Sequence, residues 1–150
     1  ILSAEVARSF FGHLVSAVSG GALYRKASFL LDAVGQQVFP SWMQIAEAPH
    51  LLRGLGSAAF DDDGLATRAQ DLIRDGMLTR YVLSTYSARK LGLASTANAG
   101  GVHNLIVTPN AGALDELFRA MGRGLYVTEL LGQGVSLITG DYSRGAAGYW

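Results

Sequence analysis

Three histidines are the first candidates for metal ligands or acid–base catalysts in this sequence. They are His13, His50 and His103, and no two of them stand four residues apart, the spacing that places two ligands on one helix face. A catalytic zinc needs three converging protein ligands, and the sequence has no cysteine to add to the set. We therefore expect no complete catalytic or metal-binding constellation in this chain.

Short acidic and glycine-rich segments fall short of known ligand-binding motifs. The acidic run at 61–64 is similar to the start of a calcium loop, but Leu72 stands at the twelfth position, where such a loop needs Glu. The glycine pairs at 122–124 and 132–134 lack the endings of phosphate-binding loops. No Gly-x-Ser-x-Gly elbow occurs, although the partners of a Ser-His-Asp triad need not be close in sequence. We interpret the segments at 61–64, 122–124 and 132–134 as turns.

Residues 141–145 form the most suggestive polar segment. A carboxylate, a phenol and a guanidinium follow one another closely there, as Asp141, Tyr142 and Arg144. Such groups could hold a peptide backbone or a carboxylate through charge-assisted hydrogen bonds. The alternative is a turn between strands that is closed by an internal bond from Arg144 to Asp141. The three side chains are therefore candidate substrate-binding residues, and both interpretations stay open.

Composition limits the class of protein. The 150 residues are 49% apolar and 16% charged, which is enough for a buried core and too apolar for a disordered chain. Twelve basic residues balance twelve acidic ones, so the charge does not favour a partner such as nucleic acid or a membrane surface. No apolar run approaches the roughly 20 residues of a membrane span, and no signal peptide is recognisable at the start. The lack of cysteine agrees with a cytoplasmic location.

The elements that must position these residues follow an α+β pattern. Apolar side chains at three- and four-residue spacing predict a helix over 3–19, capped by Ser3 and ended by the glycines at 20–21. Two short helices are expected at 84–91 and 113–121. Hairpin turns are expected at 61–64 and 75–76. Strands are expected at 42–46, 71–74, 77–82, 102–108, 125–131, 135–139 and 145–150. The pattern indicates a strand-rich domain, with some support for a barrel or sandwich.

Several longer strings resemble a known family. They lie at 11–13, 24–26, 29–32, 87–93 and 100–104, and above all at 127–134 and 138–148. Together they are similar to the TldD/PmbA family of metallopeptidases over essentially the whole chain. The resemblance implies that residues 1–150 are an excerpt of the strand-rich C-terminal domain, with an N-terminal α/β domain and the protein's C-terminal end lying outside it. It also implies a cytoplasmic two-subunit peptidase associated with microcin precursor maturation and antitoxin degradation, once labelled a modulator of DNA gyrase.

The same resemblance bears on zinc. In the family a TldD-type subunit carries zinc on a helix with the motif His-Glu-x-x-x-His, and a cysteine ligand follows much later. Matching the end of that motif to Gly12 and His13 places Arg8 at the first ligand position and Ser9 at the general base. Arginine has no lone pair for a metal, and serine cannot take a proton as a carboxylate does. The resemblance thus implies a subunit without zinc, in which only His13 is retained and the cofactor lies in a TldD-like partner.

The leading hypothesis is therefore a non-zinc subunit that presents peptide substrates to a zinc-bearing partner. Strand edges near 135–148 would bind an extended peptide through main-chain hydrogen bonds. One alternative is a structural or peptide-binding homodimer that has no peptidase activity. Another is an independent peptidase with an unrecognised site.

Overall fold

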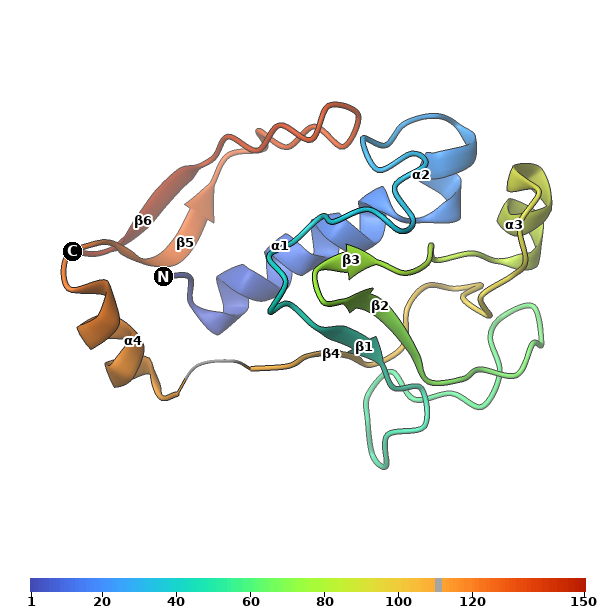
Figure 1. Ribbon diagram of the computed structural model, residues 1–150, viewed down its shortest axis with the longest axis horizontal. Coiled ribbons are helices and arrows are strands. Elements are labelled where there is room, and N and C mark those ends of the chain that lie inside the picture. The colour runs from blue at the N-terminus through green and yellow to red at the C-terminus, as the bar shows by residue number, and fades with distance from the viewer. Residues whose placement is uncertain (110–111) are drawn as a thin grey trace.

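The computed structural model describes residues 1–109 and 112–150, and within them helices and strands are interspersed along the chain (Figure 1). The helices are α1 (Ala4–Ala17), α2 (Gly20–Tyr24), α3 (Thr85–Leu91) and α4 (Leu114–Met121). The strands are β1 (Ile45–Glu47), β2 (Gln70–Arg74), β3 (Met77–Leu78), β4 (Leu105–Val107), β5 (Tyr126–Leu131) and β6 (Gly145–Tyr149). The arrangement confirms the α+β class.

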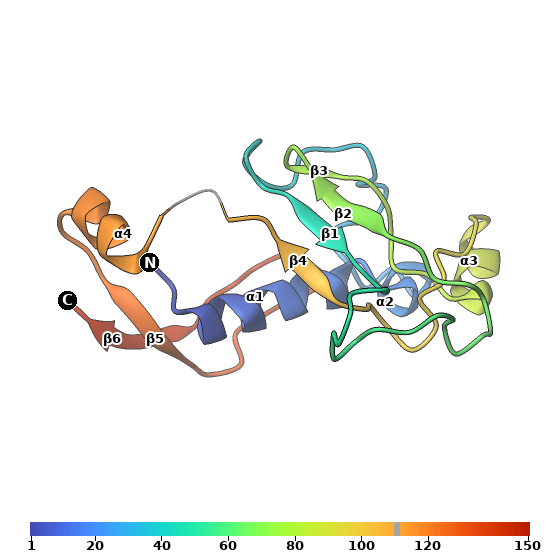
Figure 2. The same cartoon turned by 90° about the horizontal axis from the view of Figure 1, so that it is seen from below.

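The strands form two antiparallel sheets and not the barrel or sandwich that the sequence pattern favours. One sheet has the order β3-β2-β1-β4, and its central Ile45 pairs with Ile73 on one side and Val107 on the other. The other sheet is the ribbon of β5 and β6. Figures 1 and 2 show α1 running between the ribbon and the four-stranded sheet. Helix α1 therefore has one flank toward each sheet.

The main core lies where the end of α1, helix α2 and the four-stranded sheet meet. Its fully buried members include the following side chains: Val18, Leu23, Ile45, Leu72, Ile73, Leu78 and Leu83. Burying each such side chain stabilises the fold by about 1.5–3 kcal/mol. Within α1 only Val6 and Ala17 are buried, while Phe11 and Leu14 pack partly against the core. The middle of α1 is thus left to line hollows on its two flanks.

The helix predictions hold with one correction. Ser3 caps α1 and Ser84 caps α3, as expected, and Gly92 ends α3 in the left-handed conformation at φ 68°. Gly20 and Gly21 do not end α1, because the helix already stops at Ala17. Gly20 instead begins α2, a third short helix that the sequence pattern did not reveal.

The strand predictions are less accurate. The turn at Asp75 and Gly76 is confirmed, since both residues have the positive φ angles of a type I′ turn, 52° and 75°. The strand expected at 135–139 is wrong: Val135 makes a single bridge to Tyr142, and the chain then turns where Gly140 N donates to Ser136 O at 2.9 Å. The strands expected at 42–46, 77–82 and 102–108 are shorter or shifted, and the structure has them at β1, β3 and β4.

Candidate functional site

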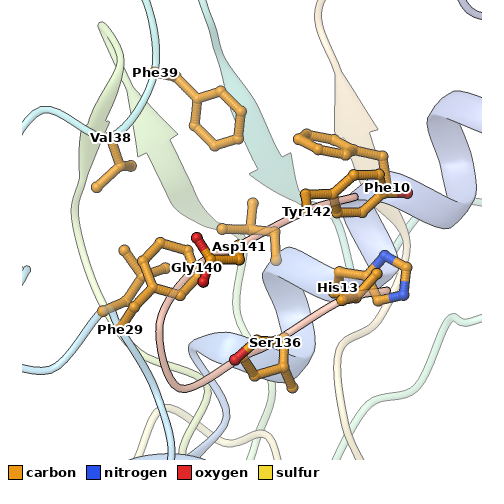
Figure 3. Close-up of a pocket in the computed structure, with 13 residues that line it drawn as sticks. Phe10, His13, Phe29, Val38, Phe39, Ser136, Gly140, Asp141 and Tyr142 are labelled. Atoms are coloured by element: carbon orange, nitrogen blue, oxygen red, sulfur yellow. The ribbon is translucent and has the colours of Figure 1, made fainter. Parts of the chain in front are cut away.

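An apolar pocket lies between α1 and the turn that joins β5 to β6 (Figure 3). Its apolar lining consists of Phe10, Leu14, Phe29, Leu30, Val38, Phe39, Val135 and Leu137. Its polar lining consists of His13, Ser136, Asp141 and Tyr142. The cavity measures about 160 Å³, and a cavity of about 150 Å³ is enough to hold benzene. One aromatic ring or branched aliphatic side chain would therefore fit.

The pocket brings together residues that the sequence had singled out separately. The ring of Tyr142 meets those of His13 and Phe10 edge-on, with centroid distances of 5.6 Å in both cases. The Asp141 carboxylate points into the pocket toward Phe29 (Figure 3). The nitrogens of His13 lie on the side of its ring away from Phe29. The interior is thus apolar, with one carboxylate at its edge.

Backbone hydrogen bonds fix the turn that carries Asp141 and Tyr142. Ser136 N donates to Asp141 O at 2.9 Å, and Ser143 N donates to Gly134 O at 2.7 Å. Phe29 N donates to Leu137 O at 2.8 Å, which docks the turn onto the chain that follows α2. The Asp141 carboxylate accepts from the Thr139 hydroxyl at 2.6 Å. The pocket is therefore held by main-chain geometry and leaves Asp141 with free acceptor sites.

Arg144 does not join this pocket. Its Nη2 donates to Leu130 O at 3.0 Å, and its Nε is buried without a partner among the described residues. Asp141 bonds instead to Thr139, so the interpretation of an internal bond between Asp141 and Arg144 is wrong. Arg144 is placed to hold β6 against β5 and does not face the cavity.

The positions of α1 matched to the family's zinc motif are Arg8, Ser9 and His13. A guanidinium at the first ligand position has no lone pair to offer a metal. His13 lines the pocket, whereas Arg8 lines a groove on the flank facing β4. Ser9 donates its hydroxyl to Val6 O at 2.9 Å. Across residues 1–109 and 112–150, no three His, Cys, Asp or Glu side chains are grouped to hold a metal.

A buried polar cluster that no sequence motif predicts surrounds Glu47. This side chain is 1% exposed and forms an ion pair with Arg80. Its Oε1 accepts from Asn98 Nδ2 at 2.8 Å and from the backbone and ring nitrogens of His103 at 2.6 and 2.9 Å. Burial lowers the pKa of the Arg80 guanidinium, an effect that the charge of Glu47 opposes. The partners stand 33 to 56 residues from Glu47, so no local motif marks them.

The acidic run at 61–64 is a turn, as predicted. Asp61 Oδ1 accepts from the backbone nitrogens of Asp63 and Leu65 at 3.0 and 2.9 Å. The Asp63 carboxylate accepts from the hydroxyl and backbone N–H of Thr85, and these bonds lower its pKa. His50 is paired with Thr67 at 2.9 Å. These groups hold loops together, and none of them completes a metal site.

Comparison with known proteins identifies the family. The sequence model of the family described as the PmbA/TldA metallopeptidase C-terminal domain matches residues 1–150. The chain belongs to this family. It is 55% identical to Metalloprotease PmbA of Escherichia coli O157:H7 over 150 residues, which is all of this chain and 33% of that protein. A PmbA homolog of Haemophilus influenzae is 52% identical over 97% of this chain and 33% of that protein. These matches confirm the resemblance predicted from the sequence.

Solved structures in the family have the same fold. A Bacteroides thetaiotaomicron protein named for modulation of DNA gyrase gives a TM-score of 0.93 at 29% identity, covering 99% of this chain and 33% of that one. TldE from Thermococcus kodakarensis gives a TM-score of 0.68 at 26% identity, covering 80% of this chain and 29% of that one. The present chain thus spans about a third of the length of its PmbA relatives. Among the described residues, every helix is too short or too polar to span a lipid bilayer.

Proposed function

We propose that this chain is part of a PmbA/TldD-type metallopeptidase and acts as the subunit that binds peptide without holding zinc. Zinc and the catalytic base then belong to a TldD-like partner subunit. The observation that carries the proposal is the pocket on α1, which His13, Asp141 and Tyr142 all line. On the same helix, Arg8 and Ser9 stand where the zinc-bearing subunit needs a ligand and a base.

The chemistry of the pocket suits one residue of an extended peptide. Its apolar interior takes a single side chain, and burying that side chain would contribute about 1.5–3 kcal/mol to binding. Asp141, at the edge, can accept a hydrogen bond from a peptide N–H. Strand β6 pairs only with β5 among the described strands, so its outer edge can add a peptide strand. Together these features support peptide binding near residues 135–148.

The finer parts of this proposal come from the family resemblance. Microcin precursors and antitoxins are the peptides that the resemblance implies, and the cytoplasm is the location. The name metalloprotease, carried by the PmbA relatives, supports a role in peptide cleavage. TldD homologs in Haemophilus and Buchnera are similar to this chain at 23% and 22% identity, which supports a TldD-like partner.

The experiment uses the intact protein that contains this chain, together with its TldD-like partner. Each is assayed alone and mixed for zinc content and for cleavage of an unstructured peptide. We expect zinc in the partner, co-elution of the two proteins and cleavage by the mixture. Stoichiometric zinc in the intact protein alone would overturn the proposal.

Two pocket variants and a control connect cleavage to the pocket. Tyr142→Ala and Asp141→Ala remove groups that contact the bound peptide, so we expect KM to rise while kcat changes little. Asp115→Ala, which removes an exposed carboxylate on α4, should change neither constant. Equal effects of all three substitutions would exclude a specific role for the pocket.

The stand-alone homodimer makes a different prediction in the same assays. It would bind peptide through the pocket, elute as a dimer of identical chains and never co-elute with the TldD-like protein. Absence of co-elution combined with pocket-dependent peptide binding would therefore favour this second function.

A further inference from the structure

A second hollow lies on the other flank of α1. It is a groove of about 860 Å³ bounded by α1, strand β4 and the loop near residue 54. The groove is lined by Ala4, Ala7, Arg8, Phe11, Gly12, Val15, Leu51, Gly54, Leu55, Gly56 and residues 102–107. Arg8 is the one charged member of this described lining. The groove is therefore apolar with a single fixed positive charge, which complements an anionic group.

His103 gives the groove an oriented imidazole. Its Nδ1 lies 2.9 Å from Glu47 Oε1, and an ionised carboxylate can only accept, so Nδ1 carries the hydrogen. In the neutral ring, Nε2 then holds the lone pair. Arg80 and Asn98 bind the same carboxylate and keep it in place. The tautomer and direction of the ring are thus set from the buried side.

The other edge of the His103 ring is available to a ligand. Nε2 forms no hydrogen bond with the described residues, and it is not among the polar atoms found buried without a partner. It therefore contacts solvent, and His103 lines the groove. Asn104 beside it differs, because its amide bonds to Ala48 O, Ser57 Oγ and Gly56 N and shapes the loop.

We propose that this groove binds the C-terminal residue of a peptide. Arg8 holds the terminal carboxylate, and a guanidinium can do so with two parallel bonds. His103 Nε2 accepts the N–H of the terminal residue. Leu51 and Leu55, which are 48% and 106% exposed, supply apolar surface for its side chain. This inference rests on the proposed function in one respect, namely that the ligand is a peptide.

The test compares two fluorescent peptides of one sequence, one with a free C-terminal carboxylate and one with a C-terminal amide. Binding to the intact protein is measured by fluorescence anisotropy. We expect the acid to bind roughly tenfold tighter or more, as one charged hydrogen-bonded pair provides. Arg8→Met should bring the two affinities together. The control Arg89→Met removes an exposed arginine of α3 and should preserve the difference.

His103→Phe tests the second contact. It should weaken both peptides by a similar factor, because both present the same N–H. Circular dichroism checks that this variant keeps its fold, and Arg8→Met provides a test that does not disturb the buried cluster.

The outcomes separate this inference from the proposed function. If the wild-type protein binds acid and amide equally, or if Arg8→Met leaves their ratio unchanged, the carboxylate site is wrong. If Tyr142→Ala still weakens both peptides in that case, the proposed peptide-binding function stands. If neither peptide binds, with or without the partner, both proposals fall.

Discussion

Glu47→Gln is predicted to loosen the fold around the buried cluster strongly. The carboxylate accepts hydrogen bonds from Asn98 and twice from His103 on one oxygen, and pairs with Arg80 on the other. Glutamine has one oxygen and one NH₂ group. If its oxygen serves Asn98 and His103, its NH₂ group faces the guanidinium, and a buried charge loses its partner. Breaking a buried pair in this way costs about 3–5 kcal/mol.

The assay is hydrogen exchange, because it reports on local opening around the cluster rather than on a single global unfolding transition. The amide of Ala48 bonds to Asn104 O at 2.8 Å and reports on how the loop after β1 is held. A loss of 3–5 kcal/mol raises local exchange by roughly 10²–10³-fold or more. The double variant Glu47→Gln, Arg80→Met has no uncompensated buried charge. The exchange rate of the Ala48 amide should therefore fall part of the way back to its wild-type value. Two results would refute this explanation. One is a wild-type exchange rate in Glu47→Gln, and the other is a faster rate in the double variant than in Glu47→Gln.

Three further predictions concern other parts of the chain. Gly76→Ala should destabilise the β2–β3 hairpin by about 3 kcal/mol or more, because φ is +75° and the new methyl meets backbone carbonyls. Gly35→Ala has a φ of +83° but open space around the new methyl, so it should cost only about 1–2 kcal/mol. Local hydrogen exchange measures both effects. Hydrogen bonds from Thr85 lower the pKa of Asp63, so its contribution to stability is present above the pKa of the unfolded chain and is lost as the pH falls through the lowered pKa. Carboxyl NMR should show this pKa rise in Thr85→Val, which lacks the hydroxyl. His13→Phe should leave the zinc content of the complex unchanged and hold or raise stability by about 1–3 kcal/mol, because Nδ1 is buried without a described partner.

Each of these has an outcome that contradicts it. Equal exchange in the two glycine variants would show that the carbonyl contacts at Gly76 do not matter. An Asp63 pKa that is the same with and without the Thr85 hydroxyl would remove the stated cause of its shift. Loss of zinc from the complex in His13→Phe would place a ligand on α1 after all.

Local signals were enough for much of the fold. Ser3, Ser84 and Gly92 bound their helices as expected because caps act on neighbouring backbone groups. The segment at 135–139 is rich in β-branched residues, as strands are, but its hydrogen bonds close a turn around Gly140. Helix α2 is too short to show periodicity, and it forms where the chain packs against α3.

The candidate site could be predicted only in part. Asp141 and Tyr142 were singled out by their chemistry, and His13 by the family resemblance. That all three line one pocket follows from contacts between distant segments, such as the bond from Phe29 N to Leu137 O over more than a hundred residues, which no local pattern encodes. The sequence does not predict the Glu47 cluster for the same reason, because its members come from β1 and from loops distant in sequence.

We propose that this chain contributes peptide binding and that its partner contributes zinc. The most direct test is to measure zinc in the intact protein purified alone, in the TldD-like partner alone and in their complex. We expect stoichiometric zinc in the partner and the complex, none above background in this protein, and cleavage only where the partner is present. Stoichiometric zinc and peptide cleavage by this protein alone would contradict it.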